Sequence, residues 1–207
     1  MRVFLDLGTN MFQGLQEFTV KLNLDNSTIV YCYEANTMVF NQSIDKKKMI
    51  ELNYKKLNHY HKAVMDYSGV ITFNSHHGAW LSGNFITEYT GGSNALNINP
   101  SGDPGNGCIF DIHQEEIECI DINDILNNII TENPDAELYI KCDIEGSEFK
   151  VLPRLLESSN IKYIKEIHIE WHERFFENTE NYNEICFLKR DIINKFNSNG
   201  ISCYDHH

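Results

Sequence analysis

The chain has 207 residues, of which 42% are hydrophobic and 12% aromatic, so it is long and apolar enough to form one folded domain. The same composition excludes an intrinsically disordered chain. Its formal net charge of −13 disfavours nucleic acid as a partner, because proteins that bind a phosphate backbone usually present a basic face. The basic run Lys46–Lys48 is interpreted as a solvated helix face rather than a binding patch.

The sequence predicts no membrane span and no secretion signal. No stretch reaches the roughly 20 apolar residues of a membrane-spanning helix, and the run at 3–5 is too short for a signal peptide. None of the 6 cysteines lies in a Cys-x-x-Cys pair, so we expect no zinc site and interpret them as reduced thiols. Reduced thiols predict a cytoplasmic protein, and for a virus-encoded chain this would be the host cytoplasm.

Strand-like and helix-like segments alternate along the chain. Strands are expected at 3–7, 28–33, 59–64, 70–73, 108–120, 137–142, 163–171 and 201–204. Helices are expected at 13–22, 40–57, from 121 onward, at 146–156 and at 182–199. This alternation is typical of an α/β fold with a parallel sheet and right-handed crossovers. We expect segment 70–73 to pair antiparallel with a later strand, and Pro153 to break or restart its helix.

One long segment, 74–107, is rich in Gly, Ser and Asn. A loop of this length inside a compact domain is usually functional or disordered. We interpret it as a substrate-side insertion in a single domain spanning 1–207, and a passive surface loop is the alternative.

Two acidic side chains follow the first two predicted strands. Asp6 and Gly8 close the first strand, where glycine permits a sharp turn and open α/β sheets bind small molecules. Glu34 closes the second strand, and an acid at that place typically accepts hydrogen bonds from both hydroxyls of an adenosine ribose. The alternative for Glu34 is an ordinary exposed loop residue.

The first turn lacks the Gly-x-Gly-x-x-Gly pattern. A dinucleotide pyrophosphate needs those glycines to approach a helix N-terminus, so NAD and FAD are disfavoured. S-adenosylmethionine has no phosphate, and its sulfonium and amino groups are positive. An acidic turn that contains Asp6 therefore suits S-adenosylmethionine better.

A second acidic segment, Asp143–Glu148, follows the strand at 137–142. Repulsion among its acids should raise at least one pKa unless a cation is near. Acids at a helix N-terminus also complement the helix dipole, which explains Glu148 better than Asp143.

A third polar segment follows at the predicted strand 163–171, where alternation would place His168, Glu170 and His172 on one face. Parallel strands are normally apolar on both faces, so this row needs an explanation. His172 or Glu170 acts as a base or substrate anchor, or the row binds a metal together with Asp143. The third alternative is a surface edge or a buried, hydrogen-bonded histidine.

Four segments together resemble the FkbM family of S-adenosylmethionine-dependent methyltransferases: Asp6-x-Gly8-x-Asn10, Tyr33–Asn36, Lys62–Val64 before Ser68-Gly69, and Lys141–Glu148. The resemblance implies a Rossmann-like class I methyltransferase fold, with a mostly parallel central sheet flanked by helices. One departure is Phe12, which stands where a glycine commonly follows the Asn.

The resemblance also implies the residues that contact S-adenosylmethionine. Asp6, Gly8 and Asn10 would lie against its methionine part, and Glu34 would bind its ribose. Ala63 and Val64 would border its adenine.

The expected activity is O-methylation of a hydroxyl group on a sugar or glycan. The catalytic candidates are Asp143, His172 and Glu170, because a sugar hydroxyl has a high pKa and needs a base during attack. No metal ion is expected, although a divalent cation is possible. The alternatives are a methyltransferase for a small natural product or lipid, and a non-catalytic binding domain of the same fold. The oligomeric state stays open.

Overall fold

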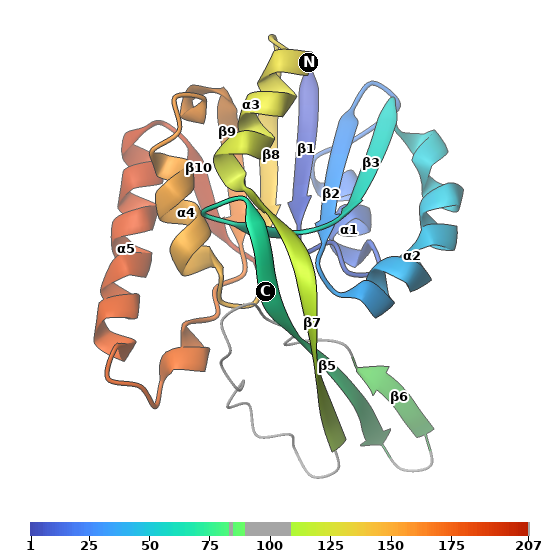
Figure 1. Ribbon diagram of the computed structural model, residues 1–207. Helices are drawn as coiled ribbons and strands as arrows, with labels where there is room; N and C mark the ends of the chain where they lie inside the picture. The colour runs from blue at the N-terminus through green and yellow to red at the C-terminus, as the bar shows by residue number, and fades with distance from the viewer. Residues whose placement is uncertain (83–84, 90–108, 207) are drawn as a thin grey trace.

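The computed structural model of the chain describes the backbone of residues 1–82, 85–89 and 109–206. Side chains are described for these residues except those at 76–112. Its centre is a six-stranded sheet in the order β10-β9-β8-β1-β2-β3 (Figure 1). Every neighbouring pair in this sheet is parallel. Its strands are β1 (Arg2–Leu7), β2 (Ile29–Glu34), β3 (Lys56–His61), β8 (Glu137–Cys142), β9 (Ile164–Ile169) and β10 (Ser202–Asp205). The predicted α/β, Rossmann-like fold is confirmed.

Helices cover both faces of this sheet, because its central strands are apolar on both sides. α3, α4 and α5 pack on the face that carries Leu5 and Leu7. α1 packs on the opposite face, against Phe4 and Val30. The α-helices are α1 (Gln13–Lys21), α2 (Thr37–Ile50), α3 (Ile122–Glu132), α4 (Glu148–Leu156) and α5 (Tyr182–Ser198), and the 3-10 helices are η1 (Glu51–Asn53), η2 (Ile161–Tyr163) and η3 (Glu173–Phe176).

The order of the strands creates a topological switch point at the end of β1. The chain first builds β2 and β3 on one side of β1, and then builds β8, β9 and β10 on its other side. The carboxyl ends of β1, β2 and β8 therefore lie together at one edge of the sheet. In open α/β sheets, this crevice is where ligands bind.

A second sheet has the order β4-β7-β5-β6. Its strands are β4 (Ala63–Met65), β5 (Gly69–Ser82), β6 (Phe85–Tyr89) and β7 (Ile109–Asp121). β5 pairs antiparallel with β7, as expected for segment 70–73. Figure 1 shows that β5, β6 and β7 extend away from the central sheet, on the side of its carboxyl ends.

The predicted insertion at 74–107 is described in part. Its segments 74–82 and 85–89 belong to β5 and β6, so the expectation of a loop is wrong there. Residues 83–84 and 90–107 lie outside the described residues. Its role as a substrate-side cover stays a prediction.

Three other predictions of local structure are wrong. The strand expected at 59–64 is divided at Lys62, because β3 pairs with β2 whereas β4 pairs with β7 in the other sheet. The helix expected at 40–57 ends at Ile50, and Leu57 belongs to β3. α4 continues through Pro153, since its buried apolar face holds the helix although proline removes one backbone donor.

Two further findings concern the membrane and the thiols. Among the described residues, no helix combines the length and apolar character needed to cross a membrane. The described cysteines, none of which forms a disulfide, are Cys32, Cys119, Cys142, Cys186 and Cys203.

Candidate active site

The turn after β1 requires a glycine. Gly8 has a φ of 76°, and its amide donates a hydrogen bond to the Tyr33 carbonyl oxygen over 3.0 Å. A Cβ atom at Gly8 would lie 1.7 Å from the Asp143 carbonyl oxygen. Only glycine therefore allows the backbone after β1 to touch the backbone after β8.

The same turn continues through two left-handed residues. Asn10 has a φ of 50° and Phe12 a φ of 60°, a conformation that costs about 1–3 kcal/mol for residues other than glycine. Phe12 is fully buried and packs its ring 4.8 Å from the His59 ring. Burial of this side chain offsets the backbone cost, which explains how Phe12 replaces the glycine common in the family that this sequence resembles.

Glu34 is a buried carboxylate at the end of β2. Its Oε2 accepts a hydrogen bond from the Asn10 amide over 2.7 Å, and its Oε1 accepts one from the Asn36 amide over 2.8 Å. Burial raises the pKa of Glu34 to about 7, although these two amides lower it. Because it is only 7% exposed, Glu34 is not an ordinary loop residue, and each oxygen keeps a lone pair for a ligand.

A cleft that is partly open to solvent lies at this edge of the sheet. The sequence-predicted residues that line it are Gly8, Asn10, Glu34, Ala63, Val64 and Asp143. The lining residues that were not predicted are Tyr33, Ala35, Asn36, Val39, Lys62, Phe73, Ile144, Glu145 and Ser147. Asn36 belongs to a segment that the sequence analysis singled out. Phe73 comes from β5 of the other sheet, and no sequence pattern places it here.

Asp6 takes a different position from the one expected. It is fully buried and does not line the cleft. Its Oδ1 instead lies 3.5 Å from the Nζ of Lys141, which also lies 3.1 Å from the Oδ2 of Asp143. In the structure Asp6 contacts Lys141, and its contact with a cofactor stays a prediction.

Lys141 is a functional candidate that the sequence analysis missed. Its Nζ donates a hydrogen bond to the Gly8 carbonyl oxygen over 2.6 Å. Burial lowers the pKa of Lys141, but the carboxylates of Asp6 and Asp143 raise it by more, so this lysine carries a charge. A buried cation thus joins the turn after β1 to the acidic segment after β8.

His168 does not share a face with Glu170 and His172, so that prediction is wrong. β9 ends at Ile169, and the alternation of side chains ends with it. His168 is buried beside Phe18 of α1 and Tyr204 of β10, with ring centroids 4.7 Å and 4.9 Å away. The alternative of a buried, hydrogen-bonded histidine therefore holds for His168.

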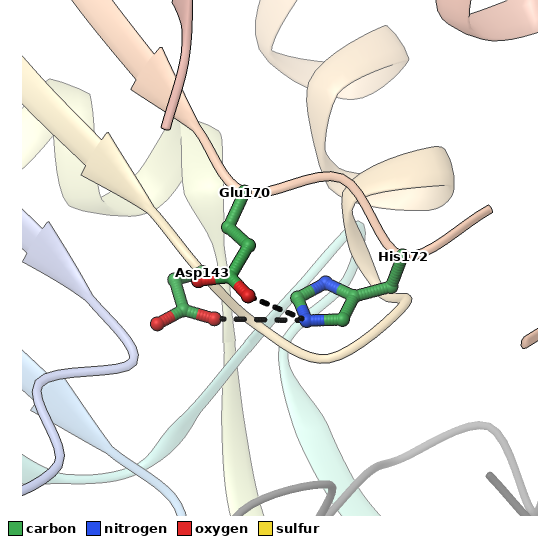
Figure 2. A group of neighbouring side chains, drawn as sticks. All are labelled: Asp143, Glu170 and His172. Atoms are coloured by element: carbon green, nitrogen blue, oxygen red, sulfur yellow. Dashed lines mark ion pairs between the residues drawn. The ribbon is translucent and has the colours of Figure 1, made fainter. Parts of the chain in front are cut away.

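Glu170 and His172 lie beside Asp143 at the carboxyl edge of the sheet (Figure 2). The Glu170 amide donates to the Cys142 carbonyl oxygen over 2.9 Å, which brings the ends of β8 and β9 together. The Nε2 of His172 lies 3.9 Å from the Oδ1 of Asp143 and 3.7 Å from the Oε1 of Glu170. All three catalytic candidates thus occupy one small region.

Carboxylates surround His172 on both sides of its ring. Its Nδ1 lies 2.9 Å from the Oε1 of the fully buried Glu148, and its Nε2 lies 3.2 Å from the Oε2 of Glu145. Burial lowers the pKa of His172, but the hydrogen bond and charge of Glu148, followed by the charges of Glu145 and Asp143, raise it to about 9. His172 is therefore an imidazolium at neutral pH, which opposes its predicted role as a base.

Comparisons with known proteins identify the family. The model of the methyltransferase FkbM domain matches residues 8–200. The chain belongs to the FkbM methyltransferase domain family. A search of the curated proteins found no match. A crystal structure of methyltransferase FkbM from Methylobacillus flagellatus KT aligns with 92% of this chain at 13% identity and a TM-score of 0.45, and the alignment covers 39% of that longer chain.

In this FkbM methyltransferase domain, the site has two parts. The part after β1 and β2 contains Gly8, Asn10 and Glu34, which line the cleft. The part after β8 and β9 contains Asp143, which also lines the cleft, and His172 beside it. Family membership supports methyl transfer, and the geometry places a ligand cleft next to ionisable side chains.

Proposed function

We propose that the protein transfers a methyl group from S-adenosylmethionine to a hydroxyl oxygen of a sugar or glycan. The observation that carries the proposal is the Glu34 carboxylate, which is buried, faces the cleft and is positioned by two backbone amides. Such a carboxylate can accept hydrogen bonds from both hydroxyls of an adenosine ribose.

The charges of the cleft favour S-adenosylmethionine over a dinucleotide. Its acidic lining residues are Glu34, Asp143 and Glu145, and Lys62 is the basic residue among the described lining residues. Lys62 is itself paired with Glu118, at 2.7 Å. A pyrophosphate would be repelled by this lining, whereas the sulfonium and amino groups of S-adenosylmethionine would be attracted.

The apolar residues of the cleft suit the adenine ring. Ala63, Val64 and Phe73 line one part of it, and each is nearly buried. Gly8 and Asn10 also line the cleft, and Gly8 lies against the Asp143 backbone, where the methionine part would bind.

When bound, S-adenosylmethionine supplies a methyl group activated by the sulfonium charge. The residues of this chain hold the acceptor hydroxyl near that methyl group, and alignment of this kind contributes up to roughly 7–11 kcal/mol. Asp143 and Glu170 are partly exposed carboxylates that can take the hydroxyl proton. His172, held by Glu148, lies beside both carboxylates and positions them.

The choice of a sugar or glycan acceptor rests on the family resemblance and on the polar composition of segment 74–107. Two experiments test the proposal. Calorimetry measures S-adenosylmethionine binding, and absence of binding at millimolar ligand would favour a non-catalytic domain. Transfer of a labelled methyl group to panels of sugars, glycans, lipids and small natural products then identifies the acceptor. Turnover confined to lipids or natural products would contradict the glycan assignment.

A further inference from the structure

We propose that Asp143, Glu170 and His172 bind a divalent transition-metal cation of the Mn²⁺ type beside the cofactor cleft. The sequence left metal binding with Asp143 as one alternative for the row His168, Glu170 and His172, and did not decide for it. The proposed role of the cation, to bind the acceptor hydroxyl, rests on the proposed function, whereas the cation site itself rests on geometry.

The three side chains offer one ligand atom each, and these atoms all lie within 4.8 Å of one another. The Nε2 of His172 lies 3.7 Å from the Oε1 of Glu170 and 3.9 Å from the Oδ1 of Asp143. Ligands about 2.1 Å from a shared metal at right angles stand about 3 Å apart. Side-chain shifts of less than about 1 Å would therefore close the site.

A second and independent observation comes from His172. Its side chain is 1% exposed, and its Nε2 forms no hydrogen bond with the described residues although it points at carboxylates (Figure 2). Nε2 forms ion pairs with Glu145, Glu170 and Asp143, none of which has hydrogen-bond geometry, so part of a desolvation cost of about 1–3 kcal/mol remains. A cation at Nε2 would remove that cost.

The orientation of the His172 ring is already that of a metal ligand. Its Nδ1 donates to the Oε1 of Glu148, which is fully buried and also accepts from the Ile144 amide over 3.0 Å. A carboxylate on one ring nitrogen with a metal on the other is the usual arrangement around metal-bound histidines. Glu148 is therefore a positioning residue.

The local charge also calls for a cation. Asp143, Glu145, Glu148 and Glu170 all lie within 3.9 Å of the His172 ring nitrogens. Lys141 balances Asp143 and Asp6, which leaves His172 to balance the others. A divalent cation at Nε2 would displace one proton and add net positive charge where the carboxylates converge.

The ligand types select the metal. An imidazole nitrogen is a better ligand for first-row transition metals than for Mg²⁺ or Ca²⁺, while two carboxylates suit Mn²⁺. Three protein ligands leave coordination positions open for water or substrate. Since Asp143 also lines the cleft, an acceptor hydroxyl bound at an open position would lie near the cofactor, and its pKa would fall.

The test is titration of the full-length, tag-free protein with MnCl₂ after chelator treatment, followed by calorimetry and by the Mn²⁺ electron paramagnetic resonance signal. We expect one Mn²⁺ per chain. Glu170→Gln is the first variant, because its side chain is 29% exposed and its replacement leaves the fold intact. Glu170→Gln and His172→Ala should each weaken Mn²⁺ binding at least 100-fold.

Two further variants separate positioning from structure. Glu148→Gln should weaken Mn²⁺ binding about 10- to 100-fold, the usual effect of losing a partner of a metal-bound histidine. His168→Gln replaces the other buried histidine of this region, which lies away from the site, and should leave Mn²⁺ affinity unchanged. Circular dichroism of each variant checks that it is folded.

Absence of Mn²⁺ binding at millimolar concentration, or equal affinity in the wild type and the Glu170→Gln variant, would overturn the cation site. Mg²⁺ binding as tight as Mn²⁺ binding would contradict the metal class. Methyl transfer that proceeds unchanged in chelator would overturn the role of the cation and leave the proposed function intact. Mn²⁺ binding without any S-adenosylmethionine binding would overturn the proposed function and leave the cation site intact.

Discussion

On the β1–β2 side of the site, the Glu34 carboxylate accepts hydrogen bonds from two backbone amides. On the β8–β9 side, the Nε2 of His172 faces carboxylates without forming a hydrogen bond with the described residues. On the first side, backbone amides already hold the Glu34 carboxylate in place, so it needs no rearrangement to accept hydrogen bonds from a cofactor. The second side gathers charge that its own residues do not fully satisfy. This difference fits the two proposals, in which the β1–β2 side binds S-adenosylmethionine and the β8–β9 side binds a cation and the acceptor.

Gly8→Ala should break the contact between the two sides and have the largest effect. The new Cβ atom would meet the Asp143 carbonyl oxygen, in a left-handed conformation that alanine disfavours. We expect a loss of about 3–4 kcal/mol in the free energy of unfolding, measured by urea denaturation. Gly200→Ala is the matched control, because Gly200 also has a positive φ, 74°, but a Cβ atom added there would have no neighbouring atom within 4 Å. Gly200→Ala should lower the free energy of unfolding by about 1–2 kcal/mol. An equal loss in the Gly8→Ala and Gly200→Ala variants would contradict the close approach of Gly8 to the Asp143 backbone.

The charge on the β8–β9 side predicts a pH dependence of stability. In chelator, the pKa of His172 is about 9 in the folded chain, against 6.5 as its ordinary value. Stabilisation by the protonated ring is therefore complete below about pH 6.5 and is lost as the pH rises through 9. We expect the wild type to lose about 3 kcal/mol between about pH 6 and pH 10, relative to a His172→Asn variant.

Urea denaturation at several pH values measures this difference. His168→Gln serves as the control, because burial lowers the pKa of His168, so its loss removes no such stabilisation at neutral pH. Parallel pH profiles for the wild type and the His172→Asn variant would show that the carboxylates do not hold the proton on His172.

Glu34→Gln tests the β1–β2 side. Loss of the hydrogen bonds that the ribose hydroxyls donate to a charged carboxylate costs about 1.5–3 kcal/mol, so we expect S-adenosylmethionine affinity to fall roughly 10- to 100-fold by calorimetry. Because burial raises the pKa of Glu34 to about 7, wild-type affinity should rise with pH up to about 7 and then level off. An affinity that is independent of pH in the wild type would argue against a ribose contact.

The smallest effect is expected from the exposed rim of the cleft. Glu118 pairs with Lys62 at 2.7 Å, but its side chain is 69% exposed. Glu118→Gln should leave the free energy of unfolding and the S-adenosylmethionine affinity nearly unchanged, because solvent screens an exposed ion pair. A larger change in binding would mean that rim charge, and not the buried Glu34, governs the cleft.

Much of the fold was predictable because it depends on local patterns. The apolar runs of β1, β2 and β8 are short, end at acids and are separated by helical periodicity, so their positions agree with the structure. The break at Lys62 was not predictable, since both halves of 59–64 favour a strand and only their pairing partners differ. Pro153 misled the prediction because buried packing of α4 outweighed its local preference.

Within the site, residues that follow strands were predictable, whereas side-chain partners were not. Gly8, Glu34 and Asp143 were found because their places at strand ends are visible in the sequence. The contact of Asp6 with Lys141 was missed, because adjacent strands separated by more than a hundred residues bring them together.

The sequence by itself determined the places of β1, β2 and β8, the glycine turn after β1 and the acids at the strand ends, since these follow from residue type and spacing along the chain. Only the tertiary structure decided which acids face the cleft, which are neutralised by Lys141, and which surround His172. Charge and burial depend on neighbours in space, and packing of distant segments sets those neighbours.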